Sequence, residues 1–280
     1  MPKAIFYYQT FYDSNKDFIS IEPVLYEGSP ITHIHLSSIH FGFNKDASRY
    51  IHLNNRTPDN SYFDKVWDDL KLAKSKGIKI IAMIGGAGGG YSTLFSDFKH
   101  FYPILRDFLK KYDIIDGVDL DIEESCRLSD IKELINDIVS DFGEDYLIAT
   151  APVSGSLIKN SPGMGGFCYK DLLNSPEGKY IDYINCQAYY GFNKNTLDAI
   201  VKNGYSSEKI VMGMIAGESY KDELKSLYDA YKDEFGGIFV WEYYDTLPSP
   251  LEWCKYVEDV FNGKITCGTK NTDSRYCIIS

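Results

Sequence analysis

Short apolar runs recur along this 280-residue chain and alternate with segments of helical spacing. The runs are rich in β-branched and aromatic residues and are bounded by Gly, Pro and polar turns, which is typical of buried strands. We expect strands at residues 4–8, 31–38, 78–84, 117–123, 146–151, 183–189, 210–215 and 237–241.

Apolar positions three and four residues apart predict helices between these strands. We expect helices at residues 63–76, 94–112, 129–142, 196–203 and 220–234, with Ser129 as an N-cap. Repeated strand–helix alternation predicts an α/β fold, the (β/α)8 or TIM barrel, in a single domain at residues 1–263 followed by a tail at 264–280. The alternative is a doubly wound open sheet, which would not need the last strand.

The charge and the apolar content of the chain limit the kinds of molecule that it is expected to bind. A formal net charge of -11 argues against nucleic acid and anionic membranes and leaves neutral ligands open. The chain has no run of about 18 apolar residues, so we expect no transmembrane helix. Residues 3–8 already predict a strand, so we expect no signal peptide in this chain, and the compartment stays open.

The expected strand at 117–123 carries carboxylates at alternate positions. Because side chains alternate across a strand, Asp119, Asp121 and Glu123 share one face, while the apolar residues between them face the helices. Carboxylates stacked on a buried face lose hydration and repel one another, which raises at least one pKa and suits acid catalysis. A solvated edge strand is the alternative. Asp116 precedes the strand and is expected to lie lower, away from the substrate.

Other polar candidates lie where neighbouring strands end. In (β/α)8 barrels the active groups lie at the C-terminal ends of the strands. Glu123, Gln187, Tyr189 and Trp241 all occupy such positions. Taken alone, Gln187, Tyr189 or Trp241 would as readily be a core residue.

Two further patterns could suggest other chemistry. The glycine-rich residues 85–90 do not fit GxGxxG, and no Lys-Ser/Thr pair follows, so we expect a tight loop that makes room for substrate rather than a phosphate cradle. His33 and His35 lack a third ligand, so we expect hydrogen-bonded core histidines and no metal.

The six cysteines form no CxxC pair, which disfavours a zinc site. Cys267 and Cys277 lie in the tail and could close a small disulfide loop, whereas Cys186 is expected to be a buried free thiol. Asn55-Arg56-Thr57 is a glycosylation sequon, which is a weak signal by itself.

The four acids Asp116, Asp119, Asp121 and Glu123 together resemble the DxxDxDxE signature of family 18 glycoside hydrolases, complete at every position. The likeness covers nearly the whole expected barrel, and it implies the TIM-barrel fold.

Other segments extend this resemblance. Residues 83–86 are similar to the family's strand-three SxGG, with Met83 where Ser is usual. Residues 187–189 are similar to its strand-six segment, although Tyr190 stands where Asp or Asn often follows. Trp241 matches the Trp that closes strand eight.

Within the family, residues 51–54, 151–153, 187–192 and 241–243 resemble short fungal-type endo-β-N-acetylglucosaminidases. Chitinases with an inserted α+β subdomain carry it between strands seven and eight. Only about one helix fits between residues 215 and 237 here. We therefore expect a minimal barrel without the insertion subdomain and with an open groove.

The resemblance implies a retaining glycosidase whose substrate assists its own cleavage. Glu123 would protonate the leaving oxygen and Asp121 would orient the 2-acetamido group of the sugar. Tyr189 would donate its hydroxyl to the acetamide oxygen. Asp119 and Asp116 would adjust the proton affinity of Asp121 and Glu123 from a deeper position in the barrel. Supporting or substrate-binding roles are further implied for Gln187, Trp241, Tyr8, Gly86 and Tyr190.

The implied partner is a GlcNAc-containing glycan, and no cofactor is implied. We favour the chitobiose core of N-linked glycans, with chitin or its oligomers as the alternative, because both present the same acetamide at the cleaved bond. A lectin-like GlcNAc-binding protein without turnover is the alternative from another class. We expect a monomer, and the substrate class favours a secreted or extracellular protein.

Overall fold

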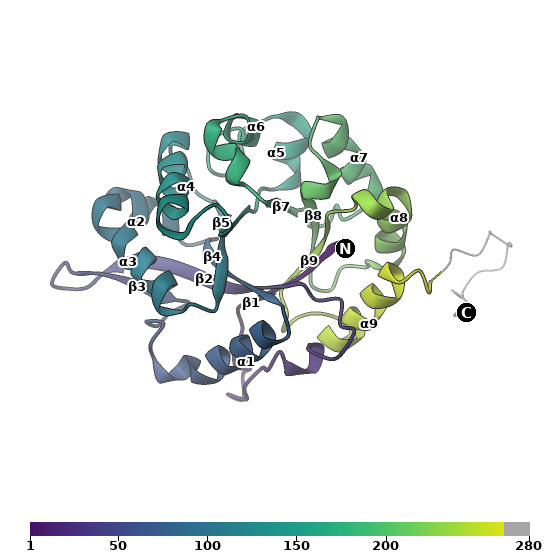
Figure 1. Cartoon of the computed structure of the whole chain (residues 1–280), viewed down its shortest axis with the longest axis horizontal. Helices are drawn as coiled ribbons and strands as arrows, with labels where there is room; N and C mark the ends of the chain where they lie inside the picture. The colour runs from purple at the N-terminus through teal and green to yellow at the C-terminus, as the bar shows by residue number, and fades with distance from the viewer. Residues whose placement is uncertain (266–280) are drawn as a thin grey trace, which may run out of the picture.

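A closed ring of parallel strands forms the centre of the molecule, and helices surround it (Figure 1). The computed structural model describes residues 1–265. The barrel strands are β1 (Lys3–Tyr8), β2 (His33–Phe43), β4 (Lys79–Gly85), β5 (Ile115–Asp121), β6 (Leu147–Thr150), β7 (Tyr183–Gln187), β8 (Ile210–Ile215) and β9 (Gly237–Trp241). Because β9 pairs with β1 and β1 pairs with β2, the ring closes. This closure confirms the predicted (β/α)8 barrel and excludes the doubly wound open sheet.

Helices pack around the outside of this ring. They are α1 (Asp64–Ser75), α2 (Gly90–Ser96), α3 (Phe98–Lys111), α4 (Leu128–Phe142), α5 (Ser154–Lys159), α6 (Tyr169–Leu173), α7 (Lys194–Lys202), α8 (Lys221–Tyr231) and α9 (Pro250–Phe261). Short 3₁₀ turns occur at Glu22–Val24, Ser61–Phe63, Pro176–Tyr180, Ser207–Lys209 and Lys232–Glu234.

All the predicted helices are present, with local differences. The predicted helix at 94–112 is divided at Asp97 into α2 and α3. The N-cap position of α4 is Arg127, so the prediction of Ser129 as the cap is wrong and Ser129 lies within the first turn. The predicted helix at 220–234 ends as a helix at Tyr231 and continues as a 3₁₀ turn.

The strands separate two apolar layers. Alternate side chains point outward to the helices or inward to the barrel axis. The inward residues form a separate cluster of Ile5, Tyr7, Met83, Ala149, Tyr183, Val211 and Phe239. Gly213 makes room for one of them, because a Cβ there would lie 1.9 Å from the ring of Phe239. The interior is therefore filled by side chains, and the site lies above it at the strand ends.

Strand β2 continues past the barrel and folds back as a hairpin. Its partner β3 (Arg49–Leu53) is antiparallel, with Ile39 opposite Leu53 and Phe43 opposite Arg49. The hairpin projects beyond the helices at the left of Figure 1. The strand β3 is not among the predicted elements, although apolar and polar residues alternate along it. It supplies one wall of a cavity described below.

The molecule is a single domain without an insertion subdomain. Between Ile215 of β8 and Gly237 of β9 the chain forms only α8 and a short 3₁₀ turn, as predicted. Within residues 1–265 no helix has the length and apolar character needed to cross a membrane. The proposed tail at 264–280, with Cys267 and Cys277, lies almost wholly outside the described residues, so the domain boundary stays a prediction.

Candidate active site

Strand β5 carries the predicted carboxylates into the barrel mouth. Asp119 and Asp121 are buried, with 0% and 5% of their surface exposed. The strand ends at Asp121, two residues earlier than predicted, so Glu123 lies on the segment that leaves the sheet. Glu123 is only partly buried. The row therefore runs from a deep aspartate to a glutamate that solvent and substrate can reach.

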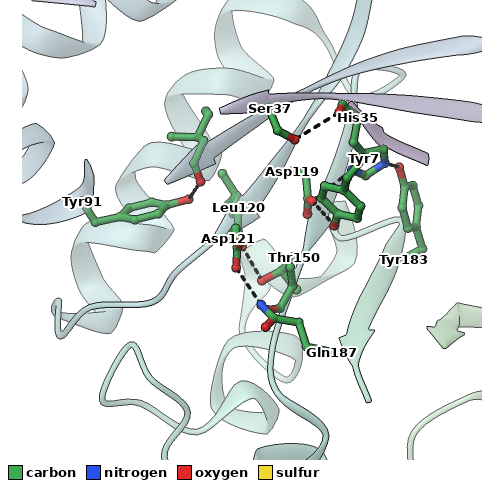
Figure 2. A network of polar contacts seen from close by, with 12 residues as sticks. Tyr7, His35, Ser37, Tyr91, Asp119, Leu120, Asp121, Thr150, Tyr183 and Gln187 are labelled. Atoms are coloured by element: carbon green, nitrogen blue, oxygen red, sulfur yellow. Dashed lines mark hydrogen bonds and ion pairs between the residues drawn. The ribbon is translucent and has the colours of Figure 1, made fainter. Parts of the chain in front are cut away.

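Asp119 is the centre of a buried hydrogen-bond network (Figure 2). Tyr7 donates its hydroxyl to Asp119 Oδ2 at 2.6 Å, and Nδ1 of His35 lies 3.0 Å from the same oxygen. The other ring nitrogen of His35, Nε2, lies 3.1 Å from the hydroxyl of Tyr183. With the proton of His35 on Nδ1, the carboxylate of Asp119 accepts hydrogen bonds from both Tyr7 and His35. Nε2 of His35 then accepts a hydrogen bond from the hydroxyl of Tyr183. Burial and the charge of Asp119 raise the pKa of Tyr7, which keeps this hydroxyl a donor.

This network confirms that His35 is a hydrogen-bonded core histidine. His33 is also buried and contacts Thr32 through Nδ1 at 2.8 Å. Within residues 1–265, no cluster of three or more His, Cys, Asp or Glu side chains could hold a metal ion.

Gln187 joins the other two acids. Its amide nitrogen lies 3.0 Å from Asp121 Oδ1, 3.3 Å from Glu123 Oε1 and 2.8 Å from the carbonyl oxygen of Ala151. An amide has two hydrogens, so these three acceptors share them. Burial is the main cause of the raised pKa of Asp121, and the charges of Glu123 and Asp119 raise it further, whereas the hydrogen bond from Gln187 lowers it. The structure thus brings together Asp121, Glu123 and Gln187, and it favours a proton on Asp121.

Tyr189 and Trp241 border the carboxylates. Both are partly buried against the inward apolar cluster. The ring of Trp241 lies 5.4 Å from that of Tyr7 between centroids. Burial, followed by the charges of Asp121 and Glu123, raises the pKa of Tyr189. Its hydroxyl therefore remains protonated and can donate a hydrogen bond near the acids.

Gly86 keeps space open beside Asp121. Its backbone N–H donates to the carbonyl oxygen of Asp121 at 2.8 Å, and its φ is 77°. A Cβ at this position would lie 2.8 Å from the methyl of Met83 and 3.4 Å from Asp121 Oδ2. A side chain would therefore be strained and would crowd the carboxyl group.

The prediction that Tyr8 reaches the sugar is wrong. Tyr8 is fully buried in the outer layer, and its hydroxyl donates to the carbonyl oxygen of Ile19 at 2.5 Å. Its neighbour Tyr7 has the inward position instead. The two residues face opposite sides because side chains alternate along β1.

Asp116 also differs from its expected supporting role. Its carboxylate lies 2.5 Å from Nζ of Lys74 on α1 and 3.2 Å from Nζ of Lys79, and it accepts from the N–H of Ile80 at 3.0 Å. A register shift at the start of β5 accompanies this orientation toward the helices. As predicted, Asp116 lies low in the barrel, and its contacts join β5 to β4 and α1 rather than to Asp119.

Tyr190 lies at the rim rather than in the wall of the site. It is 85% exposed and has a φ of 57°. Its contact with substrate stays a prediction.

Sequence reasoning missed Tyr7, Tyr183 and Glu242 as parts of the site. Glu242 is buried and accepts hydrogen bonds at Oε2 from the N–H groups of Gln9 and Thr10, at 3.0 and 3.1 Å. Burial raises its pKa. Its position directly after Trp241 was the available signal, but its partners come from the segment that follows β1 and are visible only in the fold.

The cysteines in the described part of the chain carry no disulfide. Cys126, Cys168, Cys186 and Cys254 are free, and Cys186 is buried as predicted. Burial raises the pKa of the Cys126 thiol to about 12, so it is not a reactive thiolate.

The structure is a closed parallel barrel with buried carboxylates toward the C-terminal end of β5, which is where (β/α)8 enzymes carry their active groups. The chain matches "Glycosyl hydrolases family 18" over residues 3–234 and belongs to this family. The protein is therefore a glycoside hydrolase, and the family implies a GlcNAc-containing glycan as substrate. A comparison with curated proteins gave no match.

Solved structures agree with this assignment. A fungal endo-β-N-acetylglucosaminidase from glycosyl hydrolase family 18 is 32% identical, covers 93% of this chain and 98% of its own, and has a TM-score of 0.82. The chitinase ChiC from Aspergillus fumigatus is 29% identical, covers 91% and 98%, and has a TM-score of 0.80. A family 18 chitinase from Pseudoalteromonas aurantia, 18% identical over 92% and 99% of the two chains, shares the fold with a TM-score of 0.68.

Proposed function

We propose that this glycoside hydrolase cleaves the β-1,4 bond between two GlcNAc residues with retention, and that its substrate is the chitobiose core of N-linked glycans. The observation that carries the reaction is the arrangement of Asp121 and Glu123, which share one amide donor, Gln187, at 3.0 and 3.3 Å. This arrangement places a buried acid of raised pKa directly beside a more accessible one.

Glu123 is the proton donor in this proposal. Its carboxyl protonates the glycosidic oxygen as the bond from that oxygen to the anomeric carbon breaks. Partial exposure at the barrel mouth lets Glu123 reach the leaving group and later a water molecule. General acid catalysis of this kind contributes roughly 10²–10⁴ in rate.

The acetamide oxygen of the substrate attacks the anomeric carbon, so no enzyme nucleophile is required. Two other glutamates near the mouth are already engaged, which supports this scheme. Glu124 accepts from the N–H of Tyr91 and the hydroxyl of Ser92, and Glu242 accepts from the N–H groups of Gln9 and Thr10. Both carboxylates are held in place by backbone N–H groups from neighbouring segments, so the proposal assigns neither of them a role as nucleophile.

Asp121 and Tyr189 hold the acetamide in this scheme. Because its pKa is raised, Asp121 is the acid best suited to hold a proton and to share it with a neighbouring carboxylate. In the proposal, Asp121 also orients the acetamide N–H as positive charge develops on the sugar. Oδ1 of Asp119 is buried and has no hydrogen-bond partner among the described residues, so it can accept that proton when Asp121 turns inward. The protonated hydroxyl of Tyr189 donates to the acetamide oxygen.

The second half of the reaction restores the enzyme. Water attacks the anomeric carbon of the cyclic oxazolinium intermediate, and the carboxylate of Glu123 takes the proton that the water loses. The acetamide is regenerated, and the product keeps the β configuration because the anomeric carbon is inverted twice. No cofactor takes part in this scheme.

We favour an N-glycan as the substrate because of the similarity of this chain to a solved endo-β-N-acetylglucosaminidase. The fungal endo-β-N-acetylglucosaminidase shares 32% of its residues with this chain over 98% of its own length. The similarity of 29% to a chitinase supports chitin oligomers as the second candidate. No subdomain stands between β8 and β9, and the open groove expected of such a minimal barrel would suit a branched glycan on a folded glycoprotein.

Product analysis by mass spectrometry distinguishes the candidates. Incubation with a high-mannose glycoprotein is expected to release glycans that end in one GlcNAc and to leave one GlcNAc on the asparagine. Chitin oligomers serve as the parallel substrate. Cleavage of chitin oligomers alone would contradict the N-glycan proposal and favour a chitinase.

A further inference from the structure

A cavity of about 780 Å³ lies between the hairpin of β2 and β3 and the segments that follow β1 and β4, and we call it the hairpin chamber. It is open to solvent and is lined by the segment after β1, by β2 and β3, by the turn after β3, by the 3₁₀ turn at Ser61–Phe63 and by the loop after β4. Its polar side chains include Gln9, Ser38, His52, Asn54, Asn55 and Arg56. The volume is within the range of about 300–1,000 Å³ that small-molecule sites occupy.

Two walls of the hairpin chamber continue directly into the candidate active site. On one side, Gly86 donates to the carbonyl oxygen of Asp121 at 2.8 Å, and the next residues, Ala87 and Gly88, line the chamber. On the other side, Glu242 follows Trp241 and accepts from the N–H of Gln9, which also lines the chamber. A sugar attached to the one held by Asp121 and Trp241 therefore has the chamber within reach.

Hydrogen bonds hold the floor of the hairpin chamber in place. Asn54 donates through Nδ2 to the carbonyl oxygen of Gln9 at 3.0 Å, and its Oδ1 accepts from the N–H of Ser38 at 3.2 Å. His40 is buried, and its Nε2 lies 3.2 Å from the carbonyl oxygen of Ala87. A site that is rigid before binding loses little entropy when a ligand enters.

His52 presents a hydrogen-bonding group that the fold leaves unused. Its ring stacks on that of His40, with centroids 5.6 Å apart and planes at 16°. Nδ1 of His52 donates to the carbonyl oxygen of Asn54, so the neutral ring keeps its lone pair on Nε2. Nε2 has no hydrogen-bond partner within residues 1–265, and it can accept from a sugar hydroxyl.

Arg56 supplies donors in the same chamber. Its guanidinium lies 4.5 Å from the ring centroid of Tyr62, which also lines the chamber. No Asp or Glu is among the lining residues in the described part of the chain, so no carboxylate of the chamber wall competes for the guanidinium of Arg56. Its N–H groups are thus available to neutral hydroxyl and ether oxygens, which is the chemistry of a sugar.

We infer that the hairpin chamber receives the branch sugars of an N-glycan on the non-reducing side of the cleaved bond, and that His52 and Arg56 determine the preference for such glycans over linear chitin. This inference rests on the proposed function. A GlcNAc chain continues through one hydroxyl at each sugar and needs only a groove. A branched mannose core needs additional volume to the side, and the chamber provides it next to the sugar subsite.

Steady-state kinetics with two substrates test this inference. The substrates are a high-mannose glycopeptide and a chitin oligomer of five GlcNAc units, and the variants are His52→Ala and Arg56→Ala. Each variant is expected to raise KM for the glycopeptide about tenfold, the effect of one or two lost hydrogen bonds, with kcat nearly unchanged. KM for the chitin oligomer is expected to stay within about twofold, since it makes no contact with these side chains.

Matched controls separate recognition from folding. His100 and Arg106 lie on α3 away from the chamber, so His100→Ala and Arg106→Ala are expected to leave both substrates unaffected. The milder variants His52→Gln and Arg56→Lys keep a polar group and are expected to recover part of the lost affinity. Thermal unfolding of every variant verifies that the fold is retained.

The outcomes distinguish this inference from the proposed function. If the wild type cleaves the glycopeptide and the chamber variants keep its KM, the chamber assignment is overturned while the proposed function stands. An equal rise in KM for both substrates also overturns the branch-specific role. If the wild type cleaves the chitin oligomer but not the glycopeptide, the N-glycan proposal fails, and the chamber assignment fails with it.

Discussion

Tyr7 donates its hydroxyl to Oδ2 of Asp119 at 2.6 Å, and this buried hydrogen bond joins strands β1 and β5 across the barrel interior. The two residues are 112 positions apart in the chain. The bond fixes the deepest carboxylate of the row as an acceptor, and His35 supports it from β2. Its remaining oxygen, Oδ1, has no hydrogen-bond partner among the described residues, and the charge of Asp119 also acts on Asp121 through space.

Replacing Tyr7 tests the importance of this bond. Tyr7→Phe keeps the ring in the apolar cluster but removes one donor to Asp119, which we expect to lower the free energy of unfolding by about 1–3 kcal/mol. We also expect kcat to fall about tenfold, because the orientation of Asp119 changes the proton position on Asp121. The matched control is Tyr8→Phe, which removes only the bond to Ile19. Denaturant unfolding and kcat are measured for both variants, and an equal loss of kcat would contradict a specific effect of the Tyr7–Asp119 bond on the rate.

Two neighbouring glutamates allow a close test of the proton donor. Glu123→Gln removes the acid while keeping its shape, and we expect the rate of hydrolysis to fall at least about 10²-fold. Binding of the glycan is expected to remain, which calorimetry on the variant can measure. Glu124→Gln keeps an oxygen that can accept from Tyr91, so its rate is expected to stay near that of the wild type. Similar losses in the two variants would exclude Glu123 as the specific acid.

The raised pKa of Asp121 predicts how stability depends on pH. Its folded-state pKa lies above the ordinary value of 3.8, so the folded state binds this proton more tightly than the unfolded state does. The stabilising contribution is therefore complete below about pH 3.8 and is lost as the pH rises through the folded-state pKa. Asp121→Asn removes this loss, and we expect it to raise Tm at pH 7 by about 2–4 °C for each kcal/mol recovered.

Asp121→Asn is also expected to reduce the rate at least about 10²-fold, because the group no longer exchanges a proton with its neighbours. Asp116→Asn serves as the control. It weakens contacts to Lys74 and Lys79, and we expect it to lower stability by roughly 1 kcal/mol or less and to leave the rate unchanged. Thermal unfolding between pH 4 and 8 measures both effects. A variant at position 121 that is less stable than the wild type throughout this range would contradict the raised pKa.

Removing the hydroxyl of Tyr189 tests the proposed contact with the acetamide. Tyr189→Phe keeps the ring against Phe239, whose centroid is 6.3 Å away, and removes only the donor. We expect kcat to fall about 10- to 100-fold, since a lost transition-state hydrogen bond to a charged group costs about 1.5–3 kcal/mol. Tyr244→Phe, at an exposed position after β9, is the control. An unchanged kcat for Tyr189→Phe would remove this residue from the mechanism.

The local pattern predicted the barrel well, because strand and helix periods depend on residues close together in the chain. The same alternation placed Asp119 and Asp121 on one face of β5. It did not show that β5 ends at Asp121, since that depends on where the neighbouring strands stop pairing. The hairpin strand β3 was missed for a similar reason, because a run of five residues becomes a strand only when β2 extends to pair with it.

By itself, the sequence determined the alternation of strands and helices and the identity of the acid row, since these follow from periodicity and from residue types at fixed spacing. The pairing of β1 with β9 and β2 decided between the closed ring and the open sheet that the sequence had left as the alternative. Only the tertiary structure decided that Tyr7 rather than Tyr8 faces inward and that Asp116 binds lysines of α1 and β4. The alternation of side chains along β1 predicts only that Tyr7 and Tyr8 face opposite sides of the strand. The pairing of β1 with β2 and β9 decides which of these sides faces the barrel interior. The partners of each buried polar group come from strands far apart in the chain, so the fold had to bring them together before they could be identified.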